Sequence, residues 1–269
     1  MEPNTLAGKR IVITRTREQS RILIERLEQL GAEAIAIPAI AIVPPESYEE
    51  LDAAIQAIAR YHWIVFTSAN AVRTFSERFA LTLQPAAALA RIRMAAVGSA
   101  TGEALTELLR APDLTPGLFQ ADAILPLIGN VRAKRILLPT ADIGRDVLAR
   151  GLRERGAEVD TVVAYRTVAA AEISEIAETV RSCTADAIVF ASPSGVRYAS
   201  QALIELGITS ASLSARSKRP AFICIGDVTA GAARELGLPM DATAAEHTTE
   251  GLVAAITDWF ESRDENVAT

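Results

Sequence analysis

The chain has 269 residues, half of them hydrophobic, and a formal net charge of −6 at pH 7. This length suits two domains of roughly 100–150 residues, each with its own core. No run of about 18 apolar residues occurs, so we expect no membrane span. The acidic balance, without a long block of Lys or Arg, argues against nucleic acid as a partner.

Apolar strand segments and amphipathic helices alternate along the first half of the chain. Thr16-Arg-Glu-Gln19 and Ser47-Tyr-Glu-Glu50 have the pattern of capping boxes and predict helix starts, and Gly31 predicts the end of the first helix. In chain order we expect strands at 10–14, 34–37, 63–66 and 94–97, an extended segment at 38–45, a loop at 117–120, and further helices from 47, from 68–70 to 79, at 101–109 and at 121–128.

The same alternation continues through the second half of the chain. We expect strands at 136–138, 188–190 and 222–225, an extended segment at 159–168, and helices at 143–155, 192–206, 226–236 and 248–260. Strand–helix alternation with apolar strands predicts an α/β fold in which parallel sheets are covered by helices on both faces.

The chain also contains an internal duplication. Residues 10–43 align without a gap on residues 135–168, and the segment 64–68 corresponds to 188–192. A repeat of this length indicates a duplicated domain and therefore two similar lobes. Two arrangements fit it. One is a pair of tandem domains divided near residue 130, which the repeat by itself favours; in the other, the first strand–helix–strand segment is swapped into the C-terminal domain.

Familiar catalytic motifs are missing from the sequence: it has no G-x-G-x-x-G, no P-loop, no G-x-S-x-G and no C-x-x-C. His62 and His247 have no neighbouring cluster of ligands, so we expect no metal. Cys183 and Cys224 are expected to be free thiols. Because the N-terminus also lacks a secretory pattern, we expect the protein to be cytoplasmic.

Strand-to-helix turns rich in small hydroxyl and amide residues are the remaining candidates for a site. In the simplest interpretation these residues only cap helices. Because the C-terminal ends of parallel strands form the ligand edge of such sheets, and helix N-termini attract anions, the set also predicts a cleft that binds a polyanion. The candidates are Arg15, Ser68, Asn70, Gly98, Ser99, Thr101, Thr140, Ser192, Ser194, Gly226 and Thr229.

Two of the larger polar side chains have alternative interpretations. Arg15 follows the first strand, where it either contacts a ligand carboxylate or stays solvated or salt-bridged. Tyr165 stands where the first copy of the repeat has Ile40, so the two copies differ there. It is either a packing aromatic with its hydroxyl at the surface or a phenol in the cleft that donates a proton.

Six segments together make the chain resemble the uroporphyrinogen-III synthase family over nearly its whole length. They are WIVFTSANAV at 63–72, AVGSAT at 96–101, AYRT at 164–167, ASPSGV at 191–196, CIGDVTA at 224–230 and TEGL at 249–252. The resemblance implies the swapped arrangement, with two similar lobes of flavodoxin-like topology. One lobe would comprise 1–37 and 170–269, the other 47–160, and a two-stranded β-ladder of 38–46 and 161–169 would join them.

The resemblance also implies a lyase of tetrapyrrole (haem) biosynthesis. Hydroxymethylbilane, a linear tetrapyrrole with eight carboxylates, would lose water and close to uroporphyrinogen III with inversion of ring D, without metal or organic cofactor. Tyr165 matches the family tyrosine that assists loss of the hydroxyl group. A monomer is implied, with transient contact to hydroxymethylbilane synthase. The family cleft positions are Ser68, Asn70, Thr101, Ser192, Ser194, Gly226 and Thr229.

A protein of a different class also fits the duplication, namely a non-catalytic two-lobe binding protein for a small molecule. A two-lobe transferase acting on nucleotide sugars is a third hypothesis, but its usual diphosphate or metal contacts are missing from the sequence. Identifying the macrocycle formed from hydroxymethylbilane distinguishes these hypotheses, because only the synthase would direct closure to the type III isomer.

Overall fold

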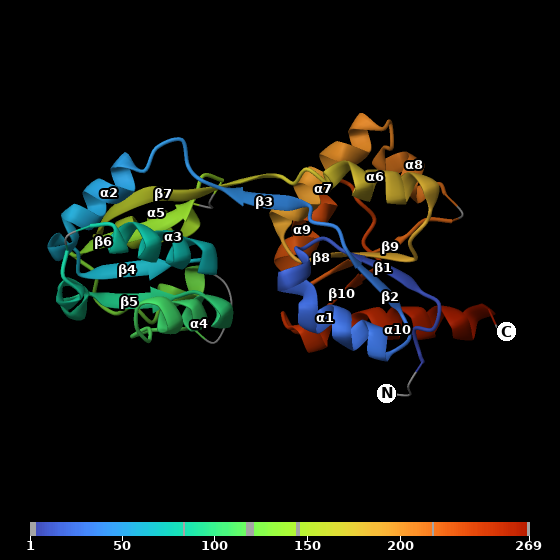
Figure 1. Ribbon diagram of the computed structural model, residues 1–269, viewed down its shortest axis with the longest axis horizontal. Helices are drawn as coiled ribbons and strands as arrows, with labels where there is room; N and C mark the ends of the chain where they lie inside the picture. Colours follow the sequence, from blue (N-terminus) through green and yellow to red (C-terminus); the bar gives the residue numbers. More distant parts are fainter. Residues whose placement is uncertain (1–3, 83, 117–120, 144–145, 217, 268–269) are drawn as a thin grey trace. The chain divides into compact units, whose positions relative to one another are not determined.

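The computed structural model describes residues 4–82, 84–116, 121–143, 146–216 and 218–267 (Figure 1). The chain divides into two compact units: unit 1 is Met1–Ala41 with Val168–Thr269, and unit 2 is Ile42–Thr167. Among the described residues, no helix is long and apolar enough to cross a membrane. The loop expected at 117–120 lies outside this described part.

A five-stranded sheet in the order β10-β9-β8-β1-β2 forms the centre of unit 1. Strand β1 comes from the N-terminal segment, yet Ile11 is in parallel register with Ala34 of β2 and with Ala187 of β8. Numbered within the unit, the order is 2-1-3-4-5, which confirms the predicted flavodoxin-like topology. The strands are β1 (Arg10–Ile13), β2 (Glu33–Ala36), β8 (Ala187–Phe190), β9 (Ala221–Cys224) and β10 (Ala242–Thr243).

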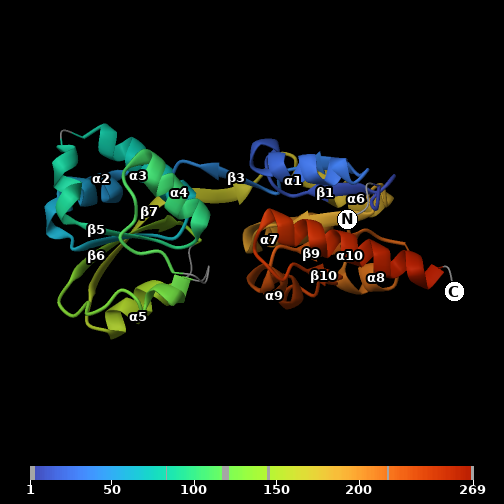
Figure 2. The ribbon, with the colours of Figure 1, turned by 90° about the horizontal axis from the view of Figure 1, so that it is seen from below.

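Helices cover both faces of this sheet (Figures 1 and 2). Alternate strand residues point to opposite faces, so Val12 and Ile188 pack against one group of helices while Ile11 and Val189 pack against the other. The first group is α6 (Ile173–Ser182), α7 (Pro193–Glu205), α8 (Ser210–Ser214) and α9 (Asp227–Glu235); the second is α1 (Arg17–Gln29) and α10 (Thr249–Val267).

Unit 2 is built around a second five-stranded sheet, in the order β3-β7-β6-β4-β5. Neighbouring strands β7, β6, β4 and β5 are parallel. Strands β3 and β7 both cross the boundary between the units and are neighbours in the sheet. The strands are β3 (Ile40–Val43), β4 (Trp63–Phe66), β5 (Arg93–Ala96), β6 (Arg135–Ala141) and β7 (Glu158–Ala169).

The sheet of unit 2 is also covered on both faces (Figure 2). Ile64 and Phe66 of β4 pack on one side, and Trp63 and Val65 on the other, as the alternation of a strand requires. The first side carries α2 (Glu49–Gln56), α3 (Ala69–Ala80) and α4 (Ser99–Leu108); the second carries α5 (Val147–Glu154) and the 3₁₀ turn η3 (Ala121–Ile124); η1 (Ile58–Arg60) and η2 (Ala86–Arg91) are short connections.

The duplication read from the sequence corresponds to equivalent strands in the two units. Strands β6, β4 and β5 of unit 2 take the places that β1, β8 and β9 take in unit 1, with β7 at the place of β2. Strands β1 and β6 start at Arg10 and Arg135, which the sequence alignment also pairs. The prediction of two similar parallel α/β lobes is therefore confirmed.

Several local expectations were wrong in detail. Thr16 caps α1 as predicted, with its hydroxyl accepting the Gln19 N–H at 3.3 Å. Ser47 instead accepts the Glu49 N–H at 3.1 Å, and α2 begins only at Glu49, so the second capping box does not form. Helix α5, expected from Ile143, begins at Val147.

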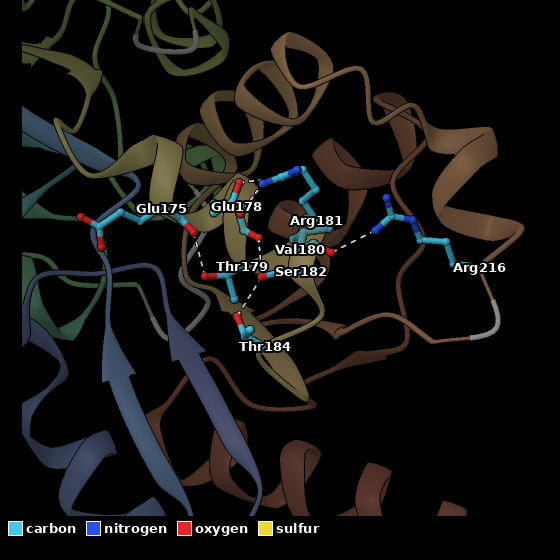
Figure 3. Close-up of polar contacts among 8 residues, drawn as sticks. All are labelled: Glu175, Glu178, Thr179, Val180, Arg181, Ser182, Thr184 and Arg216. Carbon is cyan, nitrogen blue, oxygen red and sulfur yellow. Dashed lines mark hydrogen bonds and ion pairs between the residues drawn. The ribbon is translucent and has the colours of Figure 1, made fainter.

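Helix α6 was missing from the sequence-based prediction, and Figure 3 shows the polar contacts at its C-terminal end. The Ser182 hydroxyl donates to the Glu178 carbonyl at 2.8 Å. The helix ends at Ser182, and the next residue, the C-cap Cys183, has a left-handed φ of 51°. The Arg216 guanidinium then donates to the Val180 carbonyl at 3.0 Å, satisfying one of the carbonyls that a helix C-terminus leaves without a partner.

Candidate functional site

The candidate residues lie at the C-terminal ends of the parallel strands in each unit. In unit 2, Ser68 follows β4, Gly98 follows β5 and Thr140 ends β6. In unit 1, Ser192 follows β8 and Gly226 follows β9. Since parallel strands end at one edge, each sheet gathers its own set there.

Tyr165 lies on β7 and is only 8% exposed. Its hydroxyl is 3.0 Å from the Ser68 hydroxyl, and either oxygen is able to donate this hydrogen bond. Burial raises the pKa of Tyr165 above its ordinary value; hydrogen bonds to Ser68 and Asn70 oppose the shift, and the nearby Asp142 carboxylate adds to it. The phenol is therefore protonated at neutral pH and able to donate.

Ser68 connects this phenol to the start of helix α3. Its hydroxyl oxygen accepts the Ala71 N–H at 3.1 Å, which is the N-cap interaction expected of serine. Ser192 does the same in unit 1 by accepting the Gly195 N–H at 3.0 Å. The two copies thus share a capping serine, but only unit 2 adds a tyrosine to it, because the repeat has Ile40 at the place of Tyr165.

A cavity of about 280 Å³ opens beside the Tyr165 phenol within unit 2. Its polar lining includes Thr67, Ser68 and Thr140, while Leu138 and Leu148 contribute apolar surface. The volume is at the lower limit for small-molecule sites. The pocket is suited to one ring and its substituents, and not to a whole tetrapyrrole.

Glycines occupy the N-cap positions of two other helices at these strand ends, α4 and α9. Gly98 precedes α4 with a φ of 86°, a left-handed conformation that favours glycine, and Gly226 precedes α9 with an extended φ of 170°. As far as the described residues show, neither helix has a side-chain cap. The Thr229 N–H of α9 donates to the Gly226 carbonyl at 3.1 Å. The lack of a side-chain cap at the starts of α4 and α9 favours anion binding there.

The remaining candidates lie close to these helix starts. Thr101 and Thr229 are 4% and 3% exposed and lie in the first turns of α4 and α9. Asn70 uses its side-chain oxygen to accept a hydrogen bond from Arg73 at 3.4 Å. Ser194 is half-buried, and Ser99 and Arg15 are exposed. Desolvation by the surrounding protein nevertheless lowers the pKa of the Arg15 guanidinium.

Asp142 is a site residue that the sequence analysis did not single out. One carboxylate oxygen accepts the Thr167 N–H at 3.0 Å, and the other lies 3.8 Å from the Arg166 guanidinium. The Asp142 N–H donates to the Tyr165 carbonyl at 3.1 Å. Asp142 therefore fixes the strand segment that carries Tyr165. The repeat offered a signal, since Asp142 aligns with Arg17 of the first copy and the charge is reversed.

The two histidines do not assemble a metal centre. Within the described ranges, no group of three His, Cys, Asp or Glu side chains could hold a metal ion. His62 accepts the Arg135 N–H on Nδ1 at 3.1 Å, at the start of β4. The His247 imidazole lies directly against the α-carbon of Gly226.

Comparison with known proteins places these features in a family context. The sequence matches the family described as Uroporphyrinogen-III synthase HemD over residues 22–254. It is 32% identical to uroporphyrinogen-III synthase of Synechococcus elongatus, over 96% of this chain and 98% of the relative. It is 31% identical to porphyrin biosynthesis protein HemD of Ruminiclostridium josui, over 87% of this chain and 45% of that one.

Solved structures show the same fold. A mutant uroporphyrinogen III synthase from Thermus thermophilus aligns with a TM-score of 0.67 and 21% identity, covering 95% of this chain and all of the other. The Helicobacter pylori uroporphyrinogen-III synthetase aligns with a TM-score of 0.58 and 17% identity, covering 93% and 99%.

Proposed function

Because this chain belongs to the uroporphyrinogen-III synthase family, we propose that it is the lyase that closes hydroxymethylbilane to uroporphyrinogen III with loss of water. The observation that carries this proposal is the match to the family over residues 22–254, together with 32% identity to one family member over 96% of the chain. The N-termini of α4 and α9, which begin after glycines, support the proposal, because a substrate with eight carboxylates needs many hydrogen-bond donors.

Tyr165 assists the first chemical step in this proposal. The terminal hydroxyl oxygen takes up a proton from solvent, the C–O bond breaks so that this oxygen leaves as water, and the pyrrole nitrogen electrons stabilise the resulting azafulvene cation; the proton lost from the attacking ring at closure restores the balance. The buried neutral phenol, 3.0 Å from Ser68, donates a hydrogen bond to the leaving oxygen. Its raised pKa makes full proton transfer less favourable, so Tyr165 helps this step without being indispensable.

The second step depends on how the substrate is held. The last ring attacks the cation through its already substituted carbon, passes through a spiro intermediate, fragments and closes with that ring inverted. Holding the chain so that this attack outruns direct closure requires orientation more than acid–base chemistry. The proposed carboxylate ligands are Arg15, Ser68, Asn70, Gly98, Ser99, Thr101, Thr140, Ser192, Ser194, Gly226 and Thr229.

Three further points belong to this proposal. Residues 38–46 and 161–169 are the linker between the lobes, which the neighbouring positions of β3 and β7 support. No metal or organic cofactor takes part. The protein acts as a cytoplasmic monomer that receives its unstable substrate in transient contact with hydroxymethylbilane synthase; the free thiols Cys183 and Cys224 fit a reducing compartment.

Identification of the macrocycle tests the proposal. The purified chain is supplied with hydroxymethylbilane generated in situ, and the products are oxidised and separated by chromatography. We expect the type III isomer. Formation of the type I isomer alone, which is the spontaneous product, would refute the proposed activity and favour a binding protein.

A further inference from the structure

A second cavity of unit 2 lies at the amino ends of the strands and has a volume of about 790 Å³. His62 directly precedes β4, Arg93 begins β5, and Lys134 directly precedes β6. Strand β4 has four residues, and at about 3.3 Å per residue it separates this cavity from the Ser68 edge by roughly 13 Å. The cavity is therefore distinct from the proposed reaction site.

Positive charge is concentrated in this cavity. Arg60, Arg91, Arg93 and Lys134 line it, and its described lining contains no Asp or Glu. In the part of the chain that the structure describes, Arg60, Arg91 and Lys134 form no ion pair. The cavity is therefore positively charged in a chain whose overall net charge is −6. Binding of an anion would relieve the mutual repulsion of these cations.

Two neutral groups of the lining are also left as hydrogen-bond donors. Nδ1 of His62 accepts the Arg135 N–H at 3.1 Å, so the neutral imidazole carries its proton on Nε2. The side-chain oxygen of Asn130 accepts the Arg132 N–H at 3.1 Å, which leaves the amide NH₂ to donate. The polar lining therefore matches a ligand that only accepts hydrogen bonds.

We propose that this cavity binds a small multivalent anion with at least two phosphate or carboxylate groups. Planar guanidinium groups bind both kinds of group in bidentate fashion, and the Arg93 guanidinium is held over the Trp63 ring at 4.2 Å from its centroid. A monovalent ion would leave most of the positive charge uncompensated. The volume lies within the range of small-molecule sites, about 300–1,000 Å³.

Nucleic acid fits these observations less well than a small anion. Single strands bind along grooves in which bases stack on accessible aromatic rings. Trp63 is 4% exposed, and Arg93 already occupies one face of its ring.

Calorimetric titration of the full chain at low ionic strength tests the site, with tripolyphosphate in one arm and tricarballylate in the other. We expect saturable one-to-one binding of at least one of them, weakened by added salt. If one anion binds more tightly, its phosphate or carboxylate groups are the kind that the natural ligand carries. If the two affinities are equal, the cavity selects its ligand by charge. Binding should shift the NMR signal of the Trp63 indole N–H but leave that of Trp259, the other tryptophan, unchanged.

The double variant Arg91→Glu/Lys134→Glu reverses two cavity charges on exposed side chains. We expect its affinity to fall by at least tenfold. The control Arg150→Glu/Arg234→Glu makes the same change in net charge at exposed positions outside the cavity, and its affinity should stay within about twofold of the wild type. Both variants should still form the type III macrocycle, which keeps this test independent of the proposed reaction.

Two results would overturn the inference. One is the absence of saturable binding of either anion to the wild-type chain, which does not depend on how any variant folds. The other is binding that leaves the Trp63 signal unshifted or that survives unchanged in the charge-reversed variant.

Discussion

The replacement Tyr165→Phe probes the proposed chemistry with the smallest possible change, since it removes one oxygen from a side chain that is 8% exposed. The Ser68 hydroxyl loses its 3.0 Å contact with Tyr165 but still accepts the Ala71 N–H, so the cap of helix α3 is kept. The cost in folding free energy should therefore be that of one hydrogen bond, about 0.5–1.5 kcal/mol. Urea unfolding measures it.

The effect on turnover should be larger than this stability change suggests. Loss of a general acid typically lowers a rate by about 10²–10⁴-fold. The raised pKa of Tyr165 limits proton transfer, and the electron-rich pyrrole already expels the hydroxyl group readily. We therefore expect a fall in kcat of about 10–100-fold, or about 1.4–2.7 kcal/mol. The assay follows type III macrocycle formation with hydroxymethylbilane generated in situ.

Tyr61 supplies a matched control in the same unit. It is also 8% exposed, and its hydroxyl donates to the Asp160 carboxylate at 2.7 Å, away from the Ser68 edge. Tyr61→Phe should lose comparable or greater stability because its hydrogen bond is to a charged acceptor, yet retain full turnover. Equal turnover in the Tyr165→Phe and Tyr61→Phe variants would refute the assisting role and show that Tyr165 only packs in the structure.

Three further predictions concern titration, close packing and thiol chemistry. Because burial raises the pKa of Tyr165 above 10.0, its contribution to stability is present below about pH 10 and is lost as the pH rises further; Tyr165→Phe should unfold with a shallower alkaline decline, measured by thermal melts. Gly226→Ala places a methyl group on the His247 imidazole and should cost about 1–3 kcal/mol; adding His247→Ala should recover most of it, and additive losses in urea unfolding would contradict the clash. Burial raises the pKa of Cys224 to about 12, so Ellman's reagent should label the half-buried Cys183 first and Cys224 only on unfolding; equal labelling rates would show that Cys224 is accessible.

The elements best predicted from the sequence are those whose hydrophobic pattern is unambiguous. The β4 segment, Trp63–Phe66, is a continuous apolar run, and all its residues are buried, as expected for a parallel strand with helices on both faces. Helix α6 was missed although Ile173, Ile176 and Val180 have helical spacing. Ser47 does not cap α2 because its hydroxyl accepts the Glu49 N–H, only two residues along the chain, and the N-cap position belongs to Tyr48.

For the candidate site, the sequence identified the residue types and the structure assigned their uses. Ser68 and Gly98 both stand at helix starts, but the serine hydroxyl is occupied by the Ala71 N–H, whereas the glycine leaves the N–H groups of α4 uncapped among the described residues. Asp142 was overlooked because its partners, Arg166 and Thr167, belong to a different strand.

The sequence by itself determined the alternation of strands and helices, the duplication, and the family, because periodicity, capping residues and repeated segments are local properties of the chain. Only the tertiary structure decided that β1 lies between β2 and β8 and that Tyr165 reaches Ser68, a residue 97 positions earlier. Such contacts depend on the register of strands that are distant in sequence, and local backbone preferences carry no information about that register.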